Sequence, residues 1–124
     1  IEHIKSLGNI RAFCDTAENF HIDETFSIVS YNKVLEHLTD PVKALQNTKR
    51  ALDPLGFVYV EVPDGDSAIK IGPQRQEFFI EHIYCFNFAA IDLMARKSGF
   101  QVAKMHRLKE PSGKFTIFAF LKPC

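Results

Sequence analysis

Two Glu-His pairs are the residues of this sequence best suited to chemistry. Glu36-His37 follows an apolar segment, and Glu81-His82 follows a long stretch that contains glycine and proline. An imidazole titrates near neutral pH, so His82 can take a proton from a nucleophile while Glu81 orients the ring or binds a substrate hydroxyl. The alternative is an exposed glutamate beside a histidine buried among aromatic residues. Whether the two pairs meet depends on the fold.

The spacing of the histidines and cysteines predicts no metal site and no disulfide. The five histidines lack a His-x3-His pair, and the three scattered cysteines form no Cys-x2-Cys pair. No Gly-x-Ser-x-Gly motif supports a hydrolase. Unpaired cysteines suit a reducing compartment, so we expect a cytoplasmic protein.

Polar residues directly follow two short apolar segments. Asp15 follows residues 10–14, and Tyr31 and Asn32 follow residues 26–30. In α/β sheets, ligands bind at the carboxyl ends of parallel strands, where these side chains would lie. The alternative for Asp15 and Asn32 is an ordinary turn in which the side chain bonds its own backbone.

The local patterns predict the elements that would position these residues. We expect strands at 10–14, 26–30, 57–62, 101–109 and 114–121, and a loop at 63–80. Asp40 caps a helix that begins at Pro41 and ends at the turn 53–56. Asn87 caps a second helix, which Gly99 ends.

The arrangement of the strands follows from their composition. Residues 57–62 are almost continuously apolar, which predicts a central strand, parallel to 26–30 and covered on both faces. The last two strands should form an antiparallel hairpin around the turn 110–113. The first seven residues resemble the end of a helix.

Composition places the chain among ordinary globular domains. It has 124 residues, 46% of them hydrophobic and 24% charged, so we treat 1–124 as one domain. Fifteen basic and fifteen acidic residues cancel, so binding to nucleic acid or to a membrane surface has no electrostatic support. No apolar run is long enough to cross a bilayer, and no signal peptide is visible.

Three motifs in sequence order resemble class I S-adenosylmethionine-dependent methyltransferases. They are residues 34–41 (Val-Leu-Glu-His-Leu-Thr-Asp-Pro), residues 53–63, and residues 81–87 followed by 95–100. The second departs at two positions from the Lys-Pro-Gly-Gly usual before the fifth strand of that family. The resemblance implies an α/β Rossmann-like fold with a mostly parallel sheet and a C-terminal antiparallel hairpin. It also implies S-adenosylmethionine as cofactor and a small polar acceptor, such as a sugar or a related metabolite.

The resemblance also implies roles for particular residues. Glu81 and His82 match a Glu-His pair that precedes a helix in small-molecule methyltransferases, so we expect them to be catalytic, with Tyr84 in contact with the substrate. Asp15 matches the position near the adenine amino group. The full set of expected cofactor contacts is Asp15, Thr16, Tyr31, Asn32 and His37.

One part of the family pattern has no counterpart here. The family holds its cofactor with a glycine-rich turn and a carboxylate on the ribose, and no two of the six glycines form Gly-x-Gly. Because these features are lacking, we expect the N-terminal strands of the fold to be missing and copies to associate through the exposed strand edge. The first residue is Ile1 and not Met, which suits a fragment or a processed chain. A non-catalytic interaction or scaffold domain of methyltransferase descent is therefore the alternative. A third reading is a different Rossmann-like enzyme. A glycine-rich turn encoded upstream of Ile1 would favour the enzyme.

Overall fold

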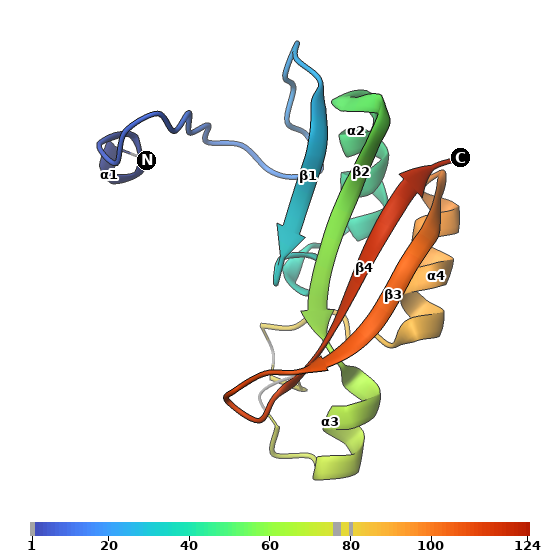
Figure 1. The fold of residues 1–124 in the computed structure, drawn as a ribbon. Coiled ribbons are helices and arrows are strands. Elements are labelled where there is room, and N and C mark those ends of the chain that lie inside the picture. Colours follow the sequence, from blue (N-terminus) through green and yellow to red (C-terminus); the bar gives the residue numbers. More distant parts are fainter. Residues whose placement is uncertain (1, 76–77, 80) are drawn as a thin grey trace.

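A four-stranded sheet with helices on one face forms the body of the molecule in this computed structural model (Figure 1). The structure describes residues 2–75, 78–79 and 81–124. The strands are β1 (Phe26–Asn32), β2 (Leu52–Pro63), β3 (Phe100–Lys109) and β4 (Phe115–Pro123), in the order β1-β2-β4-β3. β1 and β2 are parallel, and β4 is antiparallel to both β2 and β3. The predicted α/β class, the central strand parallel to β1 and the C-terminal hairpin are therefore confirmed. The sheet is mixed rather than mostly parallel, because among the described strands one pairing is parallel and two are antiparallel.

The two longest helices, α2 and α4, begin directly after their predicted capping residues. They are α1 (Glu2–Lys5), the 3-10 turn η1 (Leu35–His37), α2 (Pro41–Arg50), α3 (Gly65–Ile71) and α4 (Phe88–Lys97). The Asp40 side chain accepts a hydrogen bond from the backbone N–H of Lys43 at 2.9 Å, and the Asn87 side chain accepts one from Ala90 at 2.9 Å. Gly99 follows α4 with a φ of +80°, a conformation that glycine adopts without strain. None of the helices in the described residues is long and apolar enough to cross a membrane.

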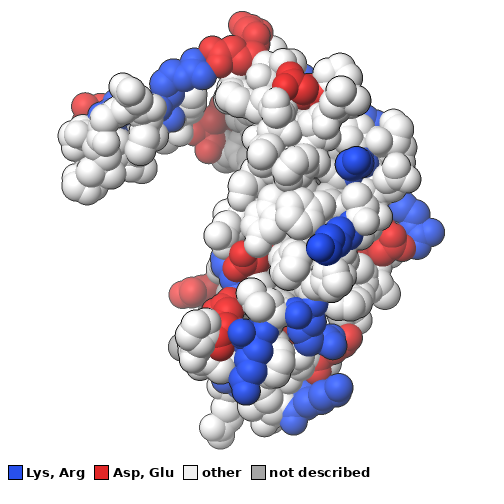
Figure 2. Space-filling view, viewed as in Figure 1, with Lys and Arg blue, Asp and Glu red and all other residues white. Residues whose placement is uncertain are grey.

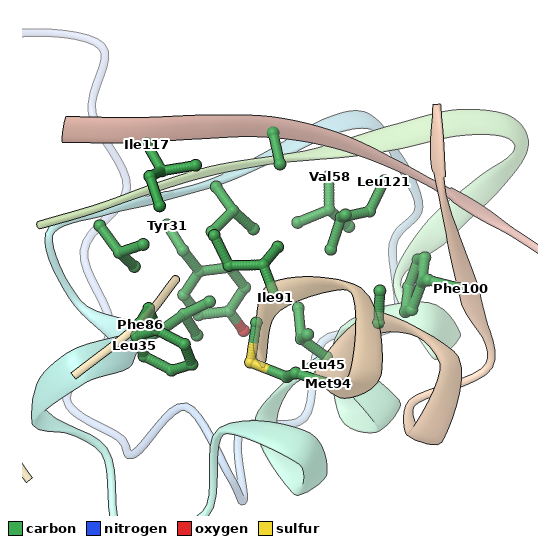
Figure 3. Close-up of a cluster of buried hydrophobic side chains, with 14 of the residues drawn as sticks. Tyr31, Leu35, Leu45, Val58, Phe86, Ile91, Met94, Phe100, Ile117 and Leu121 are labelled. Carbon is green, nitrogen blue, oxygen red and sulfur yellow. The ribbon is translucent and has the colours of Figure 1, made fainter. Parts of the chain in front are cut away.

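The core lies between the sheet and the two helices α2 and α4 (Figure 3). Side chains from β2 and β4 meet side chains from both helices there, and most of them are fully buried. The largest are Leu35, Leu45, Val58, Val60, Ile91, Phe100, Ile117 and Leu121. Tyr31 points into the same cluster from β1, so the carboxyl end of that strand is fixed to the core.

Among the described residues, no helix covers the second face of the sheet, which corrects the prediction for β2 (Figure 1). Val58, Val60 and Val62 are buried, whereas Phe57 and Tyr59, which alternate with them, are partly exposed. The exposed positions are aromatic, so they made the strand look continuously apolar although its burial alternates. Tyr59 stacks on Phe118 of β4 with ring centroids 6.4 Å apart. This uncharged region lies at the middle of the face in Figure 2, with charges of both signs around it.

Three other predicted boundaries are wrong. Residues 10–14 form no strand; they run as an exposed or half-exposed segment that leads from α1, which lies apart from the sheet (Figure 1). α2 ends at Arg50, and residues 53–56 form a bulge inside β2, because Phe26 pairs with Leu52 and Ile28 already pairs with Phe57. α3 occupies part of the predicted loop 63–80, of which residues 76, 77 and 80 lie outside the described residues.

Asp64 joins three elements at the end of β2. Its side chain is buried and accepts hydrogen bonds from Arg107 of β3, from the Ser67 hydroxyl and from the backbone N–H of Asp66. Burial by itself would raise the pKa of the Asp64 carboxyl, but the hydrogen bonds from Arg107 and Ser67 outweigh burial, so the pKa is lowered. This carboxylate therefore fixes α3 to the sheet as long as it is ionised.

Replacement of Arg107 by alanine should lower the free energy of unfolding by about 2–3 kcal/mol at pH 7. The substitution leaves the buried Asp64 carboxylate without its charged partner, and the half-exposed guanidinium keeps the loss below that of a fully buried pair. Because the folded-state pKa of Asp64 is lowered, the stabilisation is fully present above about pH 4 and is lost as the pH falls further. Urea denaturation at pH 7 and pH 3 measures both effects.

The exposed ion pair of Arg96 with Asp92 provides the control. Arg96→Ala should cost less than about 0.5 kcal/mol, because solvent screens a pair on a helix surface. Equal losses for the two variants would show that Asp64 does not depend on Arg107.

Candidate functional site

A cavity of about 480 Å³ opens at the carboxyl ends of β1 and β2. Four parts of the chain meet around it: the residues after β1, the end of β2, residues 79, 81 and 82, and the turn between β3 and β4. The lining residues are Lys33, Glu36, His37, Pro63, Phe79, Glu81, His82, Glu110, Lys114 and Phe115. This is the edge of a parallel strand pair at which α/β proteins bind ligands.

The two Glu-His pairs meet in this cavity. The ring centroids of His37 and His82 are 4.7 Å apart, with the ring planes at 76°. The Nδ1 atom of His37 lies 2.7 Å from the backbone carbonyl oxygen of Glu81. A carbonyl oxygen only accepts hydrogen bonds, so Nδ1 carries the proton, and in the neutral ring Nε2 carries the lone pair. The hydrogen bond thus fixes both the orientation and the tautomer of His37.

Glu36 is the buried member of the cluster. Its side chain is 2% exposed, and its Oε1 atom lies 3.8 Å from the Nε2 atom of His37. The Oε2 atom has no hydrogen-bond partner among the described residues. The 3-10 turn η1 explains the position, because it directs the Glu36 side chain inward while His37 faces the cavity. The donor atoms of Glu36, His37 and His82 all lie within 4.8 Å of one another.

The opposite wall of the cavity consists of paired charges. Lys33 has a left-handed backbone with a φ of 55°, and its Nζ atom lies 2.7 Å from Glu110 and 3.7 Å from Glu61. The hydrogen bonds from Lys33 and from the Thr116 hydroxyl lower the pKa of the Glu110 carboxyl. These contacts tie the end of β1 to the β3–β4 turn.

The structure brings only some of the predicted site residues to the cavity. His37, Glu81 and His82 line it. Tyr84 does not line it, but its hydroxyl donates to the carbonyl oxygen of Thr39 at 3.0 Å and so holds the segment after Glu81 against the segment after η1.

The prediction that Tyr31 lines the same cleft is wrong. Its side chain points into the core, and its hydroxyl lies 2.6 Å from that of Thr48. Burial raises the pKa of this phenol, although the bond to Thr48 acts in the opposite direction. Asn32, one residue further, is exposed at the strand end and does not line the cavity.

Asp15 and Thr16 also lie outside the cavity. Both are exposed in the segment before β1, where the backbone N–H of Thr16 donates to the Asp15 carboxylate at 2.8 Å. The hydroxyl of Thr16 accepts a hydrogen bond from the Asn19 side chain. The geometry is that of a local turn.

Sequence reasoning did not assign Lys33, Glu110 or Lys114 to the site. Glu110 and Lys114 line the cavity because the turn of the β3–β4 hairpin lies beside it, and no local sequence pattern predicts that contact. For Glu36 a signal existed, since a glutamate between leucine and histidine in an otherwise apolar turn is a candidate for burial.

Comparisons with known proteins place this chain in a well-populated fold. The sequence family described as a methyltransferase domain matches residues 5–105. No curated protein sequence matches the chain. A crystal structure of an S-adenosylmethionine-dependent methyltransferase from Clostridium acetobutylicum matches with a TM-score of 0.73 at 10% identity, over 98% of this chain and 68% of that one.

Two further structures share the fold over shorter parts of their own length. LepI in complex with S-adenosylmethionine matches with a TM-score of 0.67 at 11% identity, over 89% of this chain and 29% of that protein. The O-methyltransferase NcsB1, in complex with S-adenosyl-L-homocysteine and 1,4-dihydroxy-2-naphthoic acid, matches with a TM-score of 0.65 at 13% identity, over 89% and 33%. This chain thus spans a third or less of either protein.

Proposed function

We propose, because this chain belongs to the methyltransferase domain family, that it takes part in methyl transfer from S-adenosylmethionine to a small polar acceptor. One observation carries the proposal: the two Glu-His pairs converge in a cavity at the carboxyl ends of the parallel strands β1 and β2. Complexes of LepI and NcsB1 with S-adenosylmethionine and S-adenosyl-L-homocysteine support the choice of cofactor.

Methyl transfer requires little covalent chemistry from the protein itself. The acceptor atom attacks the methyl carbon of the sulfonium, the carbon–sulfur bond breaks, and S-adenosyl-L-homocysteine leaves as a neutral thioether. Because the cofactor is already activated, the protein must align the acceptor and accept its proton. In this proposal His82 accepts the proton and Glu81 binds a hydroxyl of the acceptor or orients the ring.

The proposed cofactor contacts are Asp15, Thr16, Asn32 and His37. Tyr31 remains in this set through its backbone alone, because its side chain is committed to the core. Tyr84 stays a proposed substrate contact because the resemblance implies it and because it lies two residues after His82.

The charges of the cavity favour a hydroxylated acceptor, such as a sugar. Three carboxylates, two ammonium groups and two imidazoles line it, and they offer hydrogen bonds of both kinds. An apolar acceptor would displace water from these groups without replacing the hydrogen bonds that the water makes. The three cysteines form no disulfide among the described residues, which supports a reducing compartment such as the cytoplasm. Association of copies through the outer edge of β1 stays a prediction.

A non-catalytic interaction domain is the second candidate. It is favoured by the absence of Gly-x-Gly from the 124 residues and by the aromatic, helix-free face of the sheet. The two candidates differ in whether the protein holds the cofactor at all.

Methyl transfer by the protein expressed from its complete reading frame tests the proposal. The protein is incubated with S-adenosylmethionine labelled at the methyl group and with a panel of sugars, phenols and amines. We expect the label in a hydroxylated small molecule. A complete protein that neither binds the cofactor nor transfers the label would favour the interaction domain. A reading frame that encodes strand, Gly-x-Gly and helix before Ile1 would favour the enzyme.

A further inference from the structure

We propose that Glu36, His37 and His82 form a binding site for a divalent first-row transition-metal ion. The site goes beyond the proposed methyl transfer, and its occupation can be measured without any acceptor or cofactor. Three observations support it: an unpartnered buried carboxylate oxygen, an oriented imidazole, and the convergence of three donor atoms at an open cavity.

The first evidence for a bound cation is the buried carboxylate of Glu36. A buried polar atom normally has a hydrogen bond, and a buried charge normally has a counter-charge or a metal. The Oε2 atom has no hydrogen-bond partner among the described residues. The ammonium group of Lys33, which also lines the cavity, is already paired with Glu110 and Glu61. A cation in the cavity would satisfy this oxygen.

His37 has the arrangement of a metal ligand. Histidine ligands usually donate their second ring N–H to a carbonyl or carboxylate oxygen, which fixes the nitrogen that binds the ion. Here Nδ1 donates to the Glu81 carbonyl oxygen, and Nε2 lies 3.8 Å from the Oε1 atom of Glu36. The backbone of residue 81 thus orients His37, while the next residue brings the second imidazole.

The distances require a small closure around the ion. Donor atoms that share one ion lie at most about 4.2 Å apart, because each bond is about 2.1 Å long. The donors here lie within 4.8 Å of one another. Side-chain rotations that move each donor atom by less than about 1 Å would bring the donors within about 4.2 Å of one another. His37 is 41% exposed and faces the cavity, so its ring has room to move.

The donor set selects the kind of ion. Two imidazole nitrogens and one carboxylate oxygen suit Zn²⁺, Fe²⁺, Co²⁺ or Ni²⁺, whereas Mg²⁺ prefers oxygen ligands alone. Three protein ligands leave coordination positions open toward the cavity. A hydroxyl of the acceptor that bound there would become more acidic, so the ion and the His82 base are alternative means of removing the same proton.

The spacing rules could not find this site. Its ligands come from two segments separated by α2, β2 and α3, and neighbouring residues in a 3-10 turn supply two of them. The fold alone brings the second imidazole to the first pair.

Metal titration of the untagged 124-residue chain tests the proposal. Calorimetry with Zn²⁺ should show one ion per chain, and Mg²⁺ should bind at least about 10-fold more weakly. Titration with Co²⁺ should give a visible spectrum of nitrogen and oxygen ligands, without the thiolate charge-transfer band that Cys14, Cys85 or Cys124 would add. Glu36→Gln and His82→Gln should each weaken Zn²⁺ binding at least about 10-fold.

His21→Gln is the matched control, because this exposed histidine pairs with Asp23 and does not line the cavity. Circular dichroism establishes that each variant is folded, and His82→Gln decides the question if Glu36→Gln does not fold. Absence of binding by the wild-type chain, a thiolate band, or equal affinities for His82→Gln and His21→Gln would each overturn the proposal.

Discussion

Replacement of His82 by alanine in a catalytically active form of the protein should lower kcat about 10²- to 10⁴-fold and change the affinity for S-adenosylmethionine less than about 2-fold. The imidazole lies in the cavity beside His37, where it can receive the acceptor proton. Proton removal acts in the transition state, so its loss appears in kcat rather than in cofactor binding. Initial rates at saturating cofactor, together with calorimetry of cofactor binding, separate the two quantities.

His21→Ala provides the control for this measurement, since it removes an imidazole from the exposed surface. Unchanged turnover of His82→Ala at saturating cofactor would exclude His82 from the chemical step. A chelator distinguishes its two possible roles. If chelation abolishes wild-type turnover and Zn²⁺ restores it, His82 acts as a ligand; if chelation has no effect, it acts as the base.

The elements with strong local signals were predictable from the sequence. Asp40-Pro41 and Asn87 begin α2 and α4 as expected, because a capping side chain and the first free N–H groups lie within four residues of each other. Gly99 and the turn at 110–113 were equally local. The parallel pair and the hairpin were predicted as well, but the pairing of β4 rather than β3 with β2 was not.

The errors arose where tertiary contacts outweigh local pattern. Residues 10–14 have the composition of a strand, but none of them pairs with the sheet. The turn at 53–56 looked like a helix end, although β1 pairs with residues on both sides of it and so includes it in β2 as a bulge. Aromatic residues on the uncovered face of β2 made its sequence look continuously apolar, although buried valines alternate with partly exposed residues along the strand.

The sequence predicted the kind of chemistry at the site but not every residue that lines it. The pairs Glu36-His37 and Glu81-His82 were found as candidates, and the fold brings them into contact. Tyr31 was assigned to the cleft because it follows the predicted strand end. β1 runs to Asn32, two residues beyond the predicted end, so Tyr31 lies inside the strand. Because side chains alternate across a sheet, Tyr31 shares the face of Val29 and points into the core.

The 124-residue chain by itself should bind S-adenosylmethionine weakly, with a dissociation constant of about 0.1 mM or higher. In the family, a glycine-rich turn lets the backbone approach the cofactor, and a carboxylate bonds the ribose hydroxyls; these residues contain no Gly-x-Gly. Loss of about three hydrogen bonds at about 1 kcal/mol each lowers the affinity by about 10²-fold or more. Titration calorimetry with the folded chain measures the constant.

The position of Asp15 adds to this expectation. No strand delivers it to the sheet edge, and its carboxylate is engaged with the backbone of Thr16 in an exposed turn. Micromolar binding would contradict the prediction and show a more complete cofactor site. Asp15→Ala, with the exposed Asp23→Ala as control, would then reveal whether the adenine contact implied by the resemblance forms. A loss confined to Asp15→Ala would mean that the segment before β1 folds onto the cofactor when it binds, since the free chain holds that carboxylate outside the cavity.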